Sequence, residues 1–343
     1  MARTAPKPSE AVQIAAIAQR YYLQDRSKKE IAREFGISRF KVARILQRAR
    51  EMGIVDVHVR LPGIIDAELS DRLRCAYRLR RAIVVTASDA SPEILRGYIG
   101  EVSANLLSEV MVEGDILGIG WGRTLTSMTG CLKELPRCTV VQLTGAIGSS
   151  DVLQSSIEMV RRVAAVSGGP AYPIYAPLIV DTPQAAQAIR RQSQTMEAFR
   201  LFDRITKAVV AIGSWDPPDS QLHDAVDAAE REVLRSLGVR AEVCSTLVAD
   251  DGHAVRADLT VRSIAISGEQ LQRIPEVIAL AGGRTKAAAI RAVLIGGYAT
   301  SLVTDTDAAK ALLASAPSNS NEGDCGGNGS SVGEGGQTDL WRT

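Results

Sequence analysis

The residues best suited to chemistry in this sequence follow apolar segments that have the pattern of β-strands. In GDILGIGWGRTLTSM, residues 114–128, closely spaced glycines and an indole stand between such a strand and the start of a helix. Glycine lets the backbone approach a ligand, and free N–H groups at a helix start attract phosphate or other oxygen-rich groups. Trp121 could stack on the apolar face of a sugar. The candidate ligand-binding residues of this loop are Gly120, Trp121, Gly122, Arg123 and Thr124.

Other strand ends repeat this arrangement. LTGAIGSSD, residues 143–151, is one, and AGGRTKAAAIRAVLIGG, residues 281–297, places Gly283 and then Lys286 at the start of a helix. Lys286 could direct a cation at a bound phosphate, although a lysine on an amphipathic helix is more often a surface residue. Gly213 ends a further strand. Because ligands of open parallel sheets bind at the carboxyl ends of the strands, we expect these loops to share one site.

Blander interpretations stand beside this one. Each glycine loop could serve strand–helix packing alone, and the dinucleotide spacing GxGxxG is absent because Gly122 comes one residue early. Asp250 or Asp251 is a further ligand candidate, but both lie in an expected turn, where Asp is common for conformational reasons. Asp305 ends a strand and could instead cap the following helix. The three histidines are far apart in sequence, so we predict no metal site, and we predict no cofactor.

The spacing of apolar residues indicates an α/β fold around these loops. Short apolar strands alternate with amphipathic stretches, which is typical of a parallel, Rossmann-like sheet covered on both faces. We expect strands at 82–86, 116–120, 139–145, 174–180, 208–213, 276–283 and 301–305. We expect helices at about 65–80, 92–111, 123–134, 151–166, 183–206, 219–237, 284–295 and 306–315. A hairpin over 243–255, with Asp251–Gly252 as its turn, should precede an extended segment at 259–267.

The N-terminal segment has the pattern of a helix-turn-helix. Ser27 and Glu30 form a capping box in front of a helix over 28–35, Gly36 supplies the turn, and Ser38 caps a second helix. Apolar residues of this second helix recur at the spacing of one buried face. An earlier helix should complete the small core with Val12, Ile14, Ile17, Ala18 and Leu23.

The second of these helices begins with cations, although the helix dipole favours acids there. Its first turn is Arg39, Phe40 and Lys41, and such a violation is expected where phosphates supply the missing anion. A charged, solvated face of an ordinary helical bundle is the alternative. We favour double-stranded DNA as the partner, with Arg39 or Arg44 reading guanine and Phe40 touching a thymine methyl group. The candidate DNA-binding residues are Ser27, Lys28, Lys29, Ser38, Arg39, Phe40, Lys41, Arg44 and Arg48.

Charge divides the chain into a basic head and an acidic body. Residues 1–60 hold 13 Lys and Arg against 6 Asp and Glu, whereas the remainder holds 27 against 33, so the formal net charge of +1 conceals both. Basic segments of this kind seek polyanions. No apolar run is long enough to cross a bilayer, the N-terminus lacks the apolar core of a secretory signal, and the 5 cysteines show no CxxC spacing. We therefore expect a cytoplasmic protein without a membrane partner.

These observations predict four regions along the chain. Residues 1–10 are expected to be disordered, 11–60 to form the helix-turn-helix domain, and 61–314 to form the ligand-binding domain. A β-rich run at 54–62 lies at their junction. Residues 315–343 carry 7 of the 29 glycines and almost no apolar residues, so they cannot bury enough surface to fold and are expected to be a disordered tail.

With both halves in view, the chain resembles the SorC family of bacterial transcriptional regulators. The matching segments, in order within about residues 10–314, are KKEIAREFGISRFKVARILQRAREMGIV, GDILGIGWGRTL, VVQLTGAIG and IPEVIALAGGRTKAAAIRAVLIGGYATSLVTD. The resemblance implies a winged or homeodomain-like helix-turn-helix and an effector domain similar to sugar-phosphate isomerases and deaminases. It also implies a sugar or phosphosugar effector, assembly through residues 61–314 into a homotetramer or homodimer, and operator affinity that changes with the effector.

The resemblance also assigns residues. Gly120 to Thr124 would border the effector, Gly145 and Gly148 would line the same cleft, and Gly283 with Lys286 would hold its phosphate. Some relatives attach an aldehyde effector to a lysine near the LTGAIG segment. Here that segment lies in a lysine-free stretch, which argues against a covalent effector at this place.

The leading hypothesis is a DNA-binding transcriptional regulator, controlled by a sugar or phosphosugar, that is not an enzyme. A sugar-phosphate isomerase or deaminase with a DNA-binding anchor is the first alternative, although the glycine loops contain no histidine to act as a base. A nucleotide-sensing regulator is the second, and the missing dinucleotide fingerprint argues against it.

Overall fold

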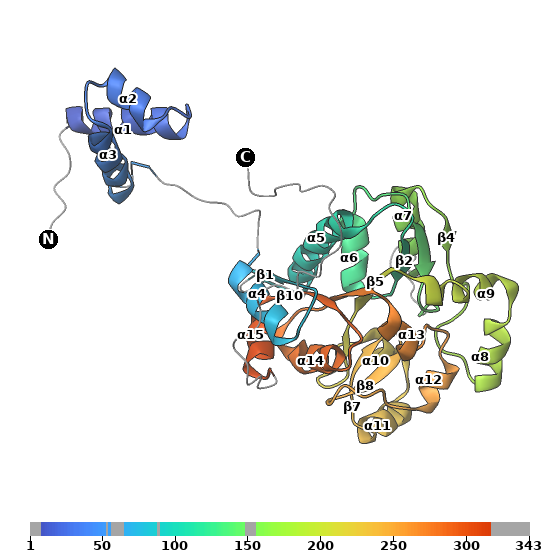
Figure 1. The fold of residues 1–343 in the computed structure, drawn as a ribbon. Helices are drawn as coiled ribbons and strands as arrows, with labels where there is room; N and C mark the ends of the chain where they lie inside the picture. The colour runs from blue at the N-terminus through green and yellow to red at the C-terminus, as the bar shows by residue number, and fades with distance from the viewer. Residues whose placement is uncertain (1–7, 53, 56–64, 88–89, 148–155, 317–343) are drawn as a thin grey trace, which may run out of the picture. The chain divides into compact units, whose positions relative to one another are not determined.

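The computed structural model describes residues 8–52, 54–55, 65–87, 90–147 and 156–316. The chain divides into two units, residues 1–63 and 64–343 (Figure 1). Each unit has a hydrophobic core of its own. Over the described ranges, no helix combines the length and the apolar character that a membrane span requires.

Three helices form the described part of the N-terminal unit. Ile17, Ile31 and Val42, one from each helix, are fully buried in its core. Val12 and Leu23 are 69% and 78% exposed, so the expectation that they join this core is wrong. Leu23 lies beyond the end of the first helix, and Val12 lies on its outer face. The helices are α1 (Pro8–Tyr22), α2 (Lys28–Glu34) and α3 (Arg39–Glu51).

The turn between α2 and α3 follows the sequence signals. Ser27 accepts a hydrogen bond from the backbone N–H of Glu30, and the Glu30 carboxylate accepts one from the N–H of Ser27 at 2.9 Å, which completes the capping box. Gly36 adopts φ +64°, a conformation that favours glycine. The expected helix-turn-helix is confirmed. Helix α1 already begins at Pro8, whereas residues 1–7 and most of the β-rich run at 54–62 lie outside the described residues.

A parallel sheet is the centre of the second unit. Its strand order is β1-β10-β9-β5-β2-β3-β4. Successive residues along a strand belong to two different cores, with Val140 and Val209 in one and Val141 and Val210 in the other. The sheet is therefore buried on both faces, as the apolar strands predicted. The strands are β1 (Arg81–Val85), β2 (Ile116–Ile119), β3 (Thr139–Gln142), β4 (Ala171–Tyr172), β5 (Lys207–Ala211), β9 (Glu276–Leu280) and β10 (Ser301–Asp305).

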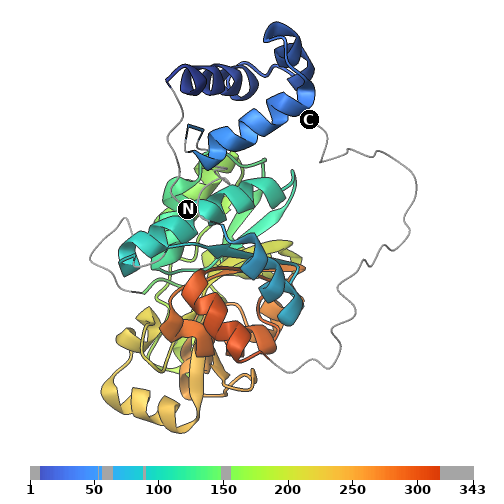
Figure 2. The same cartoon turned by 90° about the vertical axis from the view of Figure 1, so that its left-hand side faces the viewer.

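Helices cover both faces of this sheet (Figures 1 and 2). Helices α5, α6 and α7 supply Leu107, Met128 and Val160 to one core, and α4, α14 and α15 supply residues such as Leu73 and Leu312 to the other. The confirmed fold class is therefore α/β, with a small helix-turn-helix unit before it. The bounds are α4 (Ala67–Ala76), α5 (Pro92–Val110), α6 (Arg123–Cys131), α7 (Ser156–Ser167), α14 (Ala287–Ile295) and α15 (Thr306–Ala314).

A small antiparallel sheet extends the expected hairpin. The predicted turn at Asp251–Gly252 forms, and an additional, earlier turn lies at Cys244–Ser245, both at positive φ. Positive φ at both Cys244 and Ser245 is the conformation that fits the right-handed twist of the two strands joined by a two-residue turn. Asp251–Gly252 makes a second turn, after which Ala254 bridges back to Val248. The segment expected to be extended at 259–267 begins as a helix instead. The elements are β6 (Gly213–Ser214), β7 (Val239–Val243), β8 (Thr246–Ala249) and α12 (Asp258–Arg262).

Several other expected elements are shorter than predicted. The strand expected at 174–180 does not form a ladder, because Pro173 and Pro177 have no N–H to donate and β4 ends at Tyr172. Two expected helices, at 183–206 and 219–237, are each broken into shorter pieces. The pieces are α8 (Pro183–Arg190), α9 (Ser193–Phe199), η2 (Phe202–Arg204), α10 (Gln221–Ala225) and α11 (Ala228–Ser236), and the remaining short helices are α13 (Gly268–Arg273) and η3 (Arg284–Lys286).

A buried ion pair lies at the amino ends of the strands of the large sheet, called its amino edge. At the amino edge, Lys207 bonds Asp115 at 2.5 Å, and their side chains are only 14% and 7% exposed. The hydroxyl of Thr206 donates to the other oxygen of Asp115 at 2.7 Å. Burial alone would raise the pKa of Asp115, but these bonds hold that pKa below its ordinary value. The amino ends of the strands thus carry a buried structural ion pair, whereas the loops that follow the strands are free to form a site.

Candidate functional site

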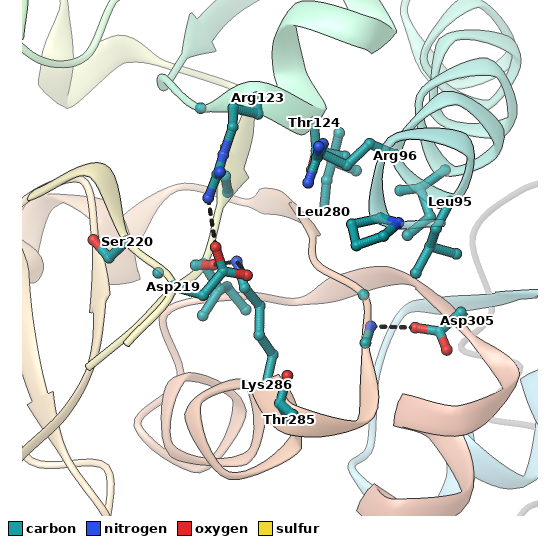
Figure 3. A pocket seen from close by; sticks show the side chains of 18 of the residues that line it. Leu95, Arg96, Arg123, Thr124, Asp219, Ser220, Leu280, Thr285, Lys286 and Asp305 are labelled. Carbon is teal, nitrogen blue, oxygen red and sulfur yellow. Dashed lines mark hydrogen bonds and ion pairs between the residues drawn. The ribbon is translucent and has the colours of Figure 1, made fainter. Parts of the chain in front are cut away.

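A pocket of about 320 Å³ opens at the carboxyl edge of the large sheet (Figure 3). It is bounded by the loops after β2, β5 and β9 and by the start of α5. Parallel neighbours bring these loops together, because β2, β5 and β9 are adjacent in the sheet. Seven of the predicted ligand-binding residues line the pocket: Trp121, Gly122, Arg123, Thr124, Gly213, Gly283 and Lys286.

Three predicted residues do not line this pocket. Gly120 lies beneath it, with its N–H bonded to the carbonyl of Val209 at 2.9 Å. Asp250 is engaged by Arg240 through two hydrogen bonds of 2.7 and 2.9 Å at another surface. Gly145 also lies elsewhere in the fold. Gly148 falls outside the described residues.

Gly145 serves close packing. A Cβ at this position would stand 2.5 Å from the carbonyl oxygen of Pro177, and its N–H donates to the carbonyl of Ile264 at 2.7 Å. The backbone of a neighbouring segment therefore occupies the space of a side chain. Trp121 is also mainly a packing residue, since it is only 9% exposed and belongs to the core beneath the pocket.

An acidic residue joins two of the cations that line the pocket. Asp219 accepts a hydrogen bond from Arg123 at 2.5 Å through Oδ1 and pairs with Lys286 at 3.2 Å through Oδ2 (Figure 3). Arg123 begins α6, Lys286 ends η3, and Asp219 lies in the turn after β6. Lys286 also donates to the carbonyl of Ile212 at 3.1 Å. Burial lowers the pKa of Lys286, and the charge of Asp219 opposes this shift.

A buried carboxyl lies beside these charges. Glu242, on β7, accepts a hydrogen bond from the hydroxyl of Ser220 at 2.9 Å through Oε1, and its Oε2 has no hydrogen-bond partner among the described residues. Burial raises the pKa of Glu242 above its ordinary value, which favours the neutral acid. A Cβ on Gly213 would meet Oε1, so glycine is required where this carboxyl approaches the end of β5.

Asp305 has a structural task at the rim. Its Oδ2 accepts hydrogen bonds from the N–H groups of Asp307 and Ala308, which confirms the expected cap of α15. Its Oδ1 accepts from the N–H of Gly283 at 2.5 Å. That N–H is therefore already engaged, and the pocket offers a ligand its cations and hydroxyls more than backbone donors.

The second candidate surface is the start of α3. The hydroxyl of Ser38 accepts from the N–H of Lys41 at 3.2 Å, and Arg39, Lys41 and Arg44 are exposed. Phe40 is 69% exposed, and the Arg39 guanidinium lies 5.0 Å from the centre of its ring. An aromatic ring left in water beside cations fits contact with base edges and phosphates.

The remaining predicted DNA-binding residues lie on both sides of this helix start. Ser27 caps α2, and the Lys28 ammonium lies 5.6 Å from the centre of the Tyr21 ring. Lys29 is exposed. Arg48 is half exposed but pairs with Glu10 at 2.6 Å, so a phosphate would have to compete with this carboxylate.

Sequence reasoning missed Asp219, Ser220 and Glu242. Asp219 and Ser220 follow a Pro–Pro turn, where polar residues are ordinary, and Glu242 is a single acid within an apolar strand. Arg96, on α5, also lines the pocket. No local pattern connects these positions, because only the folded sheet brings them together.

The comparisons with known proteins agree with this architecture. Residues 64–314 match the family described as "Putative sugar-binding domain", and residues 15–59 match a helix-turn-helix domain. The chain belongs to this sugar-binding family and, with its helix-turn-helix, is a transcriptional regulator of the SorC type.

Individual relatives extend over most of the chain. A transcriptional regulator of Escherichia coli K12, YjhU, is 30% identical over 304 residues, which cover 86% of this chain and 92% of the relative. The sorbitol operon regulator of Klebsiella pneumoniae is 27% identical over 308 residues, 88% of this chain and 97% of the relative. The crystal structure of the full-length sorbitol operon regulator SorC from that organism superposes with a TM-score of 0.68 at 26% identity, covering 89% of this chain and 99% of that one.

Gly145→Ala tests the packing role of this glycine. The added methyl group would overlap the Pro177 carbonyl, so we expect the free energy of unfolding to fall by about 1–3 kcal/mol in urea denaturation. Gly97→Ala is the matched control, because a Cβ there meets nothing within 4 Å and a helical alanine is favourable. Equal stability of the two variants would contradict the packing role.

Glu242→Gln tests the buried carboxyl. A group whose pKa is raised on folding contributes its full stability below its unfolded pKa, near 4.5, and loses it as pH rises toward the folded pKa. We therefore expect Glu242→Gln to raise Tm relative to wild type above this pH, with the gain growing as pH rises. Glu232→Gln, at an exposed position on α11, is the control and should show no such growth. A gain independent of pH would argue against a buried neutral acid.

Proposed function

We propose that this protein is a DNA-binding transcriptional regulator whose operator affinity is controlled by a sugar or phosphosugar bound in the pocket at the carboxyl edge of the large sheet. The observation that carries the proposal is a pocket with converging Arg and Lys side chains in a chain that also bears a helix-turn-helix. The relatives named as operon regulators support it.

The DNA-binding part of the proposal rests on α3. Its amino end has no acidic residue to offset the helix dipole, and Arg39, Phe40 and Lys41 are exposed there, which suits the phosphates and base edges of a major groove. Arg39, Phe40 and Arg44 are proposed to read bases, and Lys28, Lys29 and Arg48 to hold phosphates. No membrane partner is proposed, and the site of action is the bacterial cytoplasm.

The effector part rests on the chemistry of the pocket lining. The side chains of Arg96, Arg123 and Lys286 can bind phosphate or carboxylate oxygens. Thr124, Ser220 and the buried Glu242 offer hydrogen bonds to sugar hydroxyls. An effector that binds one conformation more tightly than another shifts operator affinity by that difference alone. In a homodimer or homotetramer, this shift would change the spacing of paired helix-turn-helix units on two half-sites.

One observation favours a second function. Glu242 is a buried carboxyl with a raised pKa in a sugar-sized pocket, the property of a general acid or base in isomerisation. Incubation of the purified protein with phosphosugars, followed by NMR, tests for turnover. Product formation that is lost in Glu242→Gln would establish an enzyme anchored on DNA, and we expect none.

Arg44→Ala and Lys29→Ala separate base reading from phosphate contact. We expect Arg44→Ala to weaken operator binding by roughly 1–3 kcal/mol with little effect on random duplex. Lys29→Ala should weaken both alike and reduce the slope of log affinity against log salt by about one. Fluorescence anisotropy over a salt series measures both. Equal losses on operator and random DNA for Arg44→Ala would refute its reading role.

Lys286→Ala tests the effector pocket. Removing this cation should abolish the rise in Tm that sugar phosphates cause in the full-length protein, because the ligand oxygens lose a buried partner. Lys310→Ala, at an exposed position on α15, is the control and should keep the rise. A thermal-shift screen of sugars and sugar phosphates provides the measurement. An unchanged rise in Lys286→Ala would place the effector elsewhere.

A further inference from the structure

We propose that Asp219 is a built-in competitor of the effector, whose anionic group must displace this carboxylate from Arg123 and Lys286. The inference rests on the proposed function and specifies how the same pocket is controlled. It makes the effector an anionic sugar derivative, such as a phosphate monoester, and makes Asp219 a determinant of its affinity.

The first step is the geometry of the carboxylate. Each oxygen of Asp219 contacts a different cation, at 2.5 Å from Arg123 and 3.2 Å from Lys286. Two oxygens of a phosphate group could bridge the same two cations in this way. The carboxylate thus lies where an anionic ligand would form its strongest contacts. The ligand and the Asp219 carboxylate cannot both bind the two cations fully at the same time.

The second step is that this carboxylate can leave without unfolding its loop. The backbone of Asp219 is held by two hydrogen bonds to Ser214, of 2.9 and 3.2 Å, which do not involve the side chain. The Asp219 side chain is 43% exposed, so a change of rotamer would bring the carboxylate into water. The buried Asp115–Lys207 pair at the opposite edge, with side chains 7% and 14% exposed, has no such exit.

The third step is the charge left behind. Within the described part of the chain, no other carboxylate forms an ion pair with Arg123 or Lys286. Glu242, a further acid of the lining that acts on Lys286, is buried, and this favours its neutral form. Departure of Asp219 would leave two cations without a counter-charge, one of them mostly buried. An incoming anion can meet that need, whereas a neutral sugar cannot.

The fourth step gives the class of ligand. A phosphate monoester carries a charge of about −1.5 to −2 at neutral pH and three acceptor oxygens, against one charge and two oxygens for a carboxylate. It can therefore replace Asp219 and still have an oxygen for Arg96 or Thr124. The uncharged sugar of the same skeleton would leave Asp219 in place and bind more weakly.

The experiment measures anion binding by full-length Asp219→Asn with isothermal titration calorimetry. The probes are inorganic phosphate, glucose 6-phosphate and glucose. Removing the competing charge should tighten the binding of both phosphates about tenfold and leave glucose unaffected. Asp216→Asn is the matched control, because Asp216 lies in the same turn but pairs with Arg240, and its affinities should equal those of wild type.

A second variant separates this effect from a general change of charge. In an Arg123→Gln background, Asp219→Asn should gain clearly less than tenfold, because one of the two contested cations is gone. Unchanged or weaker phosphate binding in Asp219→Asn would overturn the proposal, as would an equal gain in Asp216→Asn. Tight glucose binding that is lost in Asp219→Asn would also overturn it, by making Asp219 a ligand of the sugar.

The outcome for the proposed function can be distinguished. If Asp219→Asn gains phosphate affinity but phosphates never alter DNA binding by wild type, the competitor stands and control of the operator fails. If another effector controls DNA binding through this pocket while Asp219→Asn gains nothing, the regulator stands and the competitor fails.

Discussion

Parallel pairing in the large sheet is the constraint on which both the fold and the pocket depend. A parallel strand cannot follow its neighbour through a tight turn, so each connection crosses back over the sheet, and helices on both faces provide these crossings. The carboxyl ends of neighbouring strands consequently lie at one edge. Arg123 and Lys286 are far apart in sequence, yet both bond Asp219 because the loops after β2, β5 and β9 meet there.

The two edges of the sheet use ion pairs in opposite ways. At the amino ends of the strands, Asp115 and Lys207 are mostly buried, and the hydroxyl of Thr206 and the N–H of Val112 donate further hydrogen bonds to the carboxylate. Breaking such a pair would strand a buried charge, so it stabilises one arrangement. At the carboxyl edge, Asp219 shares two cations while remaining open to solvent. Because this carboxylate is exposed, an incoming anion can take its place, whereas its loss without a replacement would leave the mostly buried Lys286 without a counter-charge.

Local patterns in the sequence predicted the elements, and tertiary contacts decided the rest. The capping box at Ser27 and the turn at Gly36 were predictable because neighbouring residues satisfy them. Glycine loops at strand ends were predictable because the sheet places them at one edge. Gly122 and Gly145 both lie in glycine-rich loops after strands, yet Gly122 lines the pocket, whereas the Pro177 backbone packs against Gly145. Pro173 and Pro177 explain why the expected strand at 174–180 is lost. The pattern of apolar residues gave no such warning of the breaks in the helices expected at 183–206 and 219–237.

The two candidate surfaces share one feature, a helix that begins with a cationic residue. Neither α3 nor α6 has an acidic residue in its first turn, and each begins with an arginine where the helix dipole is positive. Such a start needs an anion from elsewhere. At α6, Asp219 supplies one from a distant loop, so the pocket is compensated before any ligand arrives. At α3, Arg39, Lys41 and Arg44 are exposed, and none forms an ion pair among the described residues. The same electrostatic need is therefore met internally at the pocket and left to a polyanion at the helix-turn-helix.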